Sequence, residues 1–136
     1  MVKIYSKTQP DLLCHLVRRV DEILSRENVA DDDQFLQLAT LRMNKGHSFR
    51  PHQHVWKPVE YQQTIAQESW CVIKGRVQVS FFDIDGQLLA QEEIGPGDCS
   101  MTFQGGHNYL ILEDDTVVYE YKTGPYYGQS KDKVFI

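Results

Sequence analysis

From residue 35 onward the chain consists of short apolar runs separated by turn-forming residues, and this pattern constrains the fold most strongly. The runs contain many Val, Ile, Phe and Tyr residues, which favour strands, and Gly, Pro, Asn and Asp lie between them. No long helical pattern interrupts these runs. We therefore expect an all-β antiparallel sandwich or barrel. The runs are 35–43, 69–75, 76–83, 87–94 and 116–122.

Residues 9–27 have a different period, because their apolar residues recur at helical spacing from Leu12 to Leu24. This spacing predicts an amphipathic helix, with Pro10 in its first turn, where its missing N–H is tolerated. An acidic loop follows. We expect residues 1–33 to pack as a helix and loop on a barrel that is formed by residues 34–136.

The charge, the apolar runs and the cysteine content bear on the partners and the cellular compartment of this protein. The net charge is −5, from 14 Lys and Arg and 19 Asp and Glu, which argues against the basic stripe of a nucleic-acid-binding surface. We find no signal peptide and no apolar run of the length that a membrane span needs. Cys14, Cys71 and Cys99 have no short spacing, so we expect reduced thiols and a cytoplasmic protein.

A histidine pair stands in the segment RPHQHVWKP, at His52 and His54. In an extended strand, alternate residues face the same side, so both imidazoles would share a face with Arg50. Two imidazoles on one face can bind a single divalent metal ion. The alternative is a pair of exposed histidines that are only hydrogen-bonded.

Strand alternation also predicts the character of the interior. If Glu68 points inward, Trp70 and Val72 do so too, and the alternation from Val77 to Phe81 places more apolar side chains inside. The interior would then be apolar, with a polar cluster at one end, as in many small-molecule sites. Trp70 is a candidate substrate contact, with core packing as the alternative.

The surroundings of the histidine pair resemble the cupin superfamily, whose first motif combines Gly, H-x-H, Glu and Gly, and whose second carries a further histidine. The resemblance covers residues 36–122 and includes the turn GPGD at 95–98. It implies a double-stranded β-helix, or jelly-roll barrel. It also implies four candidate metal ligands, which are His52, His54, Glu68 and His107.

One spacing departs from the superfamily. Thirteen residues separate His54 from Glu68, which is more than usual, so Glu60 is a rival ligand. We prefer Glu68, because only this residue keeps the spacing to Gly75. Three histidines and one carboxylate suit Zn, Fe, Mn or Ni, so the ligand types leave the metal unidentified.

The end of the chain carries a closer likeness, in Glu120, Lys122, the tripeptide 124–126 and the pair Asp132-Lys133. It is similar to the small single-domain cupins of bacterial surface-polysaccharide clusters, including the WbuC-type cupin metalloproteins. The likeness implies a role in the biosynthesis of O-antigen, capsule or a related glycan, with a sugar or nucleotide-sugar as ligand.

A metal ion with open positions would polarise a sugar carbonyl and assist enolisation, so we expect isomerase or epimerase chemistry. A histidine or glutamate would move the proton, and Tyr109 and Tyr121 are candidate acids. Arg50 and Lys122 are candidates for holding a substrate phosphate or carboxylate, although Lys122 could instead pair with Glu120.

Other functions fit the same residues. One is a non-enzymatic cupin that binds a sugar or nucleotide-sugar and regulates another protein. A second is a non-haem iron oxygenase, which uses two histidines and one carboxylate. A third is a metal-free epimerase with a histidine base and a tyrosine acid. We also expect a homodimer.

Overall fold

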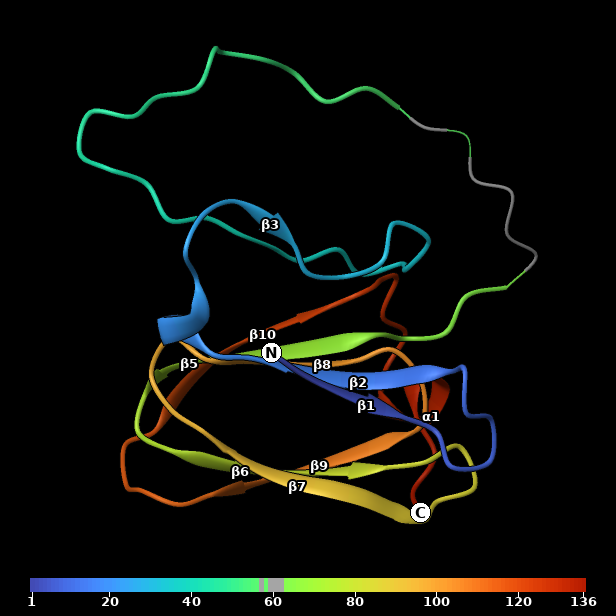
Figure 1. Cartoon of the computed structure of the whole chain (residues 1–136). Helices are drawn as coiled ribbons and strands as arrows, with labels where there is room; N and C mark the ends of the chain where they lie inside the picture. Colours follow the sequence, from blue (N-terminus) through green and yellow to red (C-terminus); the bar gives the residue numbers. More distant parts are fainter. Residues whose placement is uncertain (57, 59–62) are drawn as a thin grey trace.

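The computed structural model describes residues 1–56, 58 and 63–136, and these form antiparallel sheets (Figure 1). The larger sheet has the order β1 (Val2–Tyr5), β2 (Leu13–Arg18), β8 (Cys99–Thr102), β5 (Glu68–Lys74) and β10 (Val117–Lys122). The smaller sheet has the order β7 (Leu88–Ile94), β6 (Val77–Phe82) and β9 (Gly106–Ile111). The prediction of an all-β fold is confirmed.

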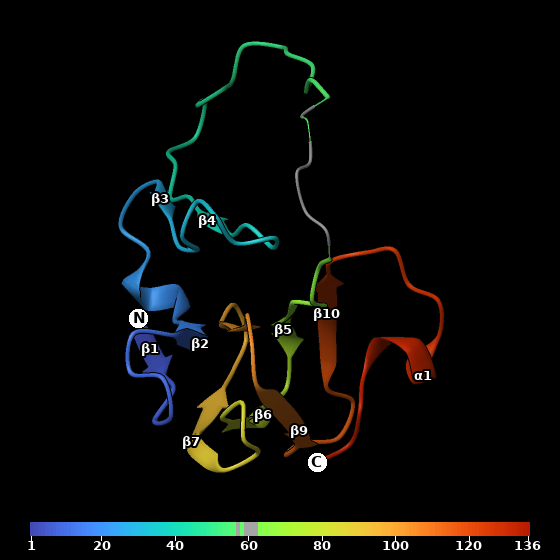
Figure 2. The ribbon, with the colours of Figure 1, turned by 90° about the vertical axis from the view of Figure 1, so that its right-hand side faces the viewer.

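Two short helices and one two-stranded sheet complete the described chain. A 3-10 helix, η1, spans Val20–Glu22, and a four-residue helix, α1, spans Gln129–Asp132. The strands β3 (Glu27–Asn28) and β4 (Ala39–Thr40) pair outside the larger sheet. Figure 2 shows this pair, the larger sheet and the smaller sheet as successive layers.

Four of the five predicted runs form strands at nearly the predicted positions, namely β5, β6, β7 and β10. The run 35–43 contains only the two residues of β4. The sequence pattern missed β8 and β9 as strands. β8 lies in the middle of the larger sheet and β9 at an edge of the smaller one. Both strands contribute side chains to the interior.

The predicted helix at 9–27 is wrong, since this segment contains β2 and η1. All six residues of β2 are buried, because the smaller sheet covers one face of the strand and residues 29–38 cover the other. A strand that is buried on both faces has a continuous apolar run. Such a run also satisfies helical spacing, which explains the error. The segment 1–33 therefore adds two strands to the larger sheet.

The main core lies between the two sheets. It includes Val17 of β2, Val72 of β5 and Phe81 of β6, none of which is exposed. Glu68 and Val72 are buried, and Trp70 packs against this core. The alternation predicted for β5 and β6 is therefore confirmed.

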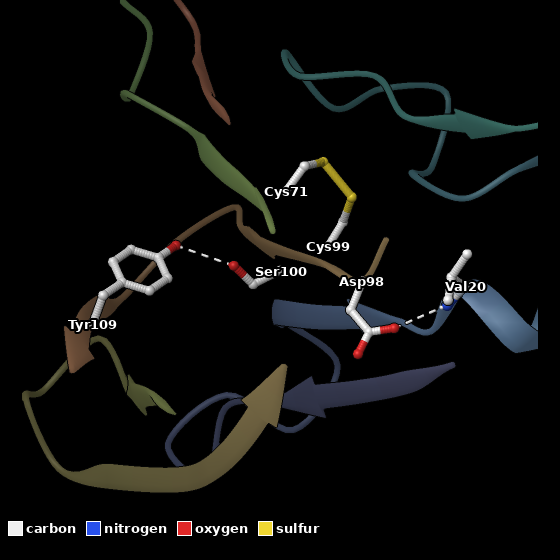
Figure 3. Close-up of a disulfide and its surroundings, with 6 residues drawn as sticks. All are labelled: Val20, Cys71, Asp98, Cys99, Ser100 and Tyr109. Carbon is white, nitrogen blue, oxygen red and sulfur yellow. Dashed lines mark hydrogen bonds between the residues drawn. A yellow bond between two sulfur atoms is a disulfide. The ribbon is translucent and has the colours of Figure 1, made fainter. Parts of the chain in front are cut away.

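A disulfide joins Cys71 of β5 to Cys99 of β8 (Figure 3), so the prediction of reduced thiols is wrong for these two residues. The two cysteines lie directly opposite each other, with their Cα atoms 4.3 Å apart. This spacing is typical of a non-hydrogen-bonded antiparallel pair and allows the bond. The spacing of the cysteines in the sequence gave no signal for this bond, because the register of β5 on β8 decides which cysteines lie opposite each other.

A thiol titration tests this bond. Unfolded without reductant, each chain should expose only the thiol of Cys14, which is buried and free in the folded protein. Adding reductant should release Cys71 and Cys99, and reduction should lower the free energy of unfolding by about 3 kcal/mol. Three thiols without reductant would contradict the bond. Disulfides are rare in the cytosol, so the titration also bears on the predicted cytoplasmic location.

Among the helices in the described part of the chain, none has the length and apolar character needed to cross a membrane.

Candidate functional site

A row of polar side chains crosses the larger sheet at one end of its inner face. The strand register places Lys122 of β10 opposite Glu68 of β5, Glu68 opposite Thr102 of β8, and Thr102 opposite His15 of β2. Residues that are directly opposite in antiparallel strands point to the same face. Four neighbouring strands therefore each contribute one polar group to the interior.

His107 of β9 joins this row from the smaller sheet. Its Nε2 atom lies 3.1 Å from Oε1 of Glu68, and its Nδ1 atom lies 3.0 Å from the hydroxyl of Thr102. The same hydroxyl lies 3.1 Å from Nδ1 of His15. The Nε2 atom of His15 is 2.9 Å from the carbonyl oxygen of Phe82. One hydrogen-bonded chain therefore runs from Phe82 to Glu68.

A glycine turn makes room for this series of hydrogen bonds. Gly105 has a φ of +79°, and a Cβ atom at this position would lie 2.3 Å from the carbonyl oxygen of Phe82. That oxygen is the acceptor for His15. A larger residue would therefore disturb the hydrogen-bonded chain just before β9 begins.

The hydrogen bonds have one consistent direction. The Phe82 carbonyl can only accept, so Nε2 of His15 donates to it. Burial lowers the pKa of His15 to about 4, so this ring is neutral, and its Nδ1 accepts the hydroxyl proton of Thr102. The Thr102 oxygen must then accept from Nδ1 of His107.

The charge state of Glu68 completes this assignment. Burial raises the pKa of Glu68, but the hydrogen bond from His107 and the nearby positive charges outweigh burial and hold the pKa below its usual value. Glu68 is therefore a carboxylate, and Nε2 of His107 donates to it. The two residues form a histidine–carboxylate pair, with 3.1 Å between Nε2 of His107 and Oε1 of Glu68.

The folded protein should lose stability as the pH falls from about 6.5 to about 4. In this window the unfolded chain binds a proton at His15, whereas the folded protein keeps this ring neutral until its pKa near 4. Unfolding is therefore favoured, by on the order of 3 kcal/mol across the window. Urea unfolding at several pH values measures the effect. A His15→Asn variant should show a flatter dependence, and an unchanged slope would contradict the assignment.

Aromatic side chains form the wall beside the pair. The rings of Trp70 and Tyr109 stack with their centroids 3.8 Å apart. The indole N–H of Trp70 donates to Glu120 at 3.2 Å, and the Tyr109 hydroxyl lies 3.1 Å from that of Ser100 (Figure 3). Burial raises the pKa of Tyr109, so its phenol stays protonated at neutral pH and can act as a donor.

The predicted metal ligands do not all come together. Glu68 and His107 are in contact, whereas His52 and His54 are exposed on a segment that runs away from the sheets (Figure 1). His52 donates to the carbonyl oxygen of Arg50 at 2.9 Å. In residues 1–56, 58 and 63–136, no three His, Cys, Asp or Glu side chains group as metal ligands. The four-ligand set stays a prediction, since the described residues bring only Glu68 and His107 of this set into contact. The rival ligand Glu60 lies outside the described residues.

The remaining predicted site residues lie on the inner face, on the outer face and on the exposed segment. Trp70, Tyr109 and Lys122 belong to the inner face, as described above. Tyr121 pairs with Ser69 on the outer face and is 54% exposed, so the structure separates it from the Glu68 carboxylate. Arg50 lies on the exposed segment with the histidine pair.

The sequence interpretation missed two members of the site. His15 lies within the segment 9–27 for which the sequence predicts a helix, and neither it nor Thr102 shows a signal of a functional role in the sequence. Both lie in the polar row because β2 pairs with β8. In a strand over 13–18, parity places His15 and Val17 on one face, but only the pairing of the strands brings Thr102 beside His15.

No family model, curated protein or solved structure matches this chain. The fold and the site define an all-β protein with two facing antiparallel sheets and a buried polar site at one end of its interior. The cupin resemblance rests on the sequence motifs alone.

Proposed function

We propose that this chain is a small cupin that binds an activated sugar between its sheets and transfers a proton at the carbon beside the sugar carbonyl. The observation that carries the proposal is the contact between Glu68 and His107, at 3.1 Å. A histidine–carboxylate pair in a partly enclosed site suits general acid–base catalysis. The resemblance adds the expectation of surface-glycan biosynthesis.

The chemistry uses the protein's own groups. The Glu68 carboxylate would accept the proton as the C–H bond breaks, and the electron pair would move onto the carbonyl oxygen. Lys122 supplies positive charge beside Glu68, which would stabilise a developing oxyanion, and His107 is in contact with the same carboxylate. Return of the proton to the other carbon or the other face completes an isomerisation or epimerisation.

The stacked Trp70 and Tyr109 rings support a sugar as the ligand. Sugar-sized ligands are commonly held by an apolar wall together with a few polar groups that set their orientation. Here the wall is next to the pair, because the ring centroids of Tyr109 and His107 are 5.0 Å apart. The protonated Tyr109 phenol is the available second proton donor.

Solvent exchange tests the proposal directly. The protein is incubated in D2O with a panel of nucleotide-activated keto sugars, and NMR follows the C–H signal beside the carbonyl. We expect enzyme-dependent loss of this signal for at least one sugar. Binding without exchange would favour the non-enzymatic sugar-binding function. Oxygen uptake by an iron-loaded protein would favour the oxygenase.

The divalent metal ion that the resemblance implies stays a prediction, and a separate measurement tests it. Elemental analysis compares the wild-type protein, purified without a metal column, with the His52→Ala/His54→Ala variant. Because His52 and His54 do not contact Glu68 or His107, we expect this variant to keep most of its exchange activity, also with a chelator present. Stoichiometric metal that is lost in the variant together with activity would contradict this expectation and would support the four-ligand site.

The predicted homodimer and the cytoplasmic location are further parts of the proposal. Sedimentation measures the oligomeric state, and the thiol titration described above addresses the compartment.

A further inference from the structure

A cavity of about 410 Å³ opens beside the candidate site. Residues 64–66, which precede β5, form one wall, and residues 123–125, which follow β10, form another. Tyr127, Lys131 and Asp132 of the C-terminal segment line the remainder. The volume lies within the range of roughly 300–1,000 Å³ that small-molecule sites occupy. The proton-transfer chemistry proposed for Glu68 and His107 does not use this cavity.

The cavity wall carries two charged groups, Asp132 and Lys131. The Asp132 side chain is only 9% exposed, and its carboxylate accepts a hydrogen bond from Nζ of Lys122 at 3.4 Å. Lys122 is shared, because its Nζ also lies 3.7 Å from the carboxylate of Glu120. Lys131 is exposed, and in the part of the chain that the structure describes no carboxylate lies within ion-pair distance of it. Lys131 is therefore the exposed and unpaired cation of the cavity wall among the described residues, and it would attract an anionic ligand.

Asp132 also connects the cavity to the polar row. Lys122 binds Asp132, and it lies directly opposite Glu68 in the register of β10 on β5. The ammonium group is also held over the Tyr126 ring, 4.0 Å from its centroid. A ligand that extends from the cavity past this lysine would therefore reach Glu68.

The C-terminal segment is held at both ends, which keeps this wall of the cavity in place. At one end Asp132 and Tyr126 hold Lys122, at the end of β10. At the other end Ile136 packs on Gly106, where an added Cβ would lie 2.7 Å from the isoleucine side chain. Gly106 precedes His107, and Figure 2 shows the chain terminus beside β9. The segment thus bridges the two sheets next to the site.

We propose that this cavity binds the phosphate-bearing part of the activated sugar, with Lys131 as its counter-charge, while the sugar ring lies at Glu68 and Trp70. The inference rests on the proposed function, because that function supplies the class of ligand. Lysine is a suitable point charge for phosphate, and a charge-assisted hydrogen bond adds to the attraction.

Calorimetric titration of the whole chain with uridine 5′-diphosphate tests the cavity without requiring catalysis. We expect binding that weakens with salt, and a Lys131→Gln variant should bind roughly tenfold more weakly. The control is Lys3→Gln, since Lys3 is exposed on β1, at the opposite edge of the larger sheet. A second variant, Ala66→Trp, fills the cavity and should abolish binding, while circular dichroism checks its fold.

The outcomes separate this inference from the proposed function. Equal affinity of the wild-type, Lys131→Gln and Ala66→Trp proteins, or no binding by the wild-type protein, would overturn the cavity assignment. Loss of binding in both variants, with no proton exchange on any keto sugar, would support the cavity and refute the catalytic proposal. Proton exchange that survives Lys131→Gln with an unchanged KM would refute the cavity alone.

Discussion

The Glu68→Gln variant should exchange the sugar C–H proton at least about 100-fold more slowly than the wild-type protein, because general acid–base groups typically contribute a factor of roughly 10² to 10⁴. The amide keeps the shape of the side chain and can still hydrogen-bond to His107, but it cannot accept the substrate proton. NMR in D2O measures both rates on the same sugar.

The matched control for this variant is Glu93→Gln. Glu93 is on β7, and its side chain is 55% exposed where it pairs with Arg76, so its exchange rate should stay at the wild-type value. A thermal unfolding curve for each variant shows that the fold is retained. If Glu68→Gln exchanged the proton as fast as Glu93→Gln, Glu68 would not be the base, and the proposed chemistry would be wrong.

Phe81→Ala should lower the free energy of unfolding by about 3–5 kcal/mol. Phe81 is fully buried between the sheets, and its ring lies against that of His15, with the centroids 4.8 Å apart. Truncation to alanine would remove this contact and leave a cavity beside the polar row. Denaturant unfolding at constant pH measures the change in the unfolding free energy.

The neighbouring residue provides the control, since Phe82 is on the opposite face of β6 and is only partly buried. Its backbone carbonyl, which accepts the hydrogen bond from His15, is unaffected by truncation of the side chain. Phe82→Ala should therefore cost clearly less than Phe81→Ala. Similar costs for both variants would contradict the inward orientation of Phe81.

The candidate site could be predicted only in part. Glu68, Trp70 and Val72 were assigned to one inner face by alternation within β5, and the structure agrees. The contact of Glu68 with His107 depends instead on how the two sheets face each other, which no local pattern encodes. The four-ligand set required His52 and His54 at the same place, and the described residues do not bring them there.

The sequence by itself determined the all-β class, four of the strands and the side of β5 that faces inward. These features follow from local rules, since residue type sets strand preference and alternation sets the face. Only the tertiary structure decided that residues 13–18 form a strand, because burial on both faces erases the alternating pattern. It also decided the Cys71–Cys99 bond and the row from Lys122 to His15. Both depend on strand register, which arises from contacts between residues that are far apart in the chain.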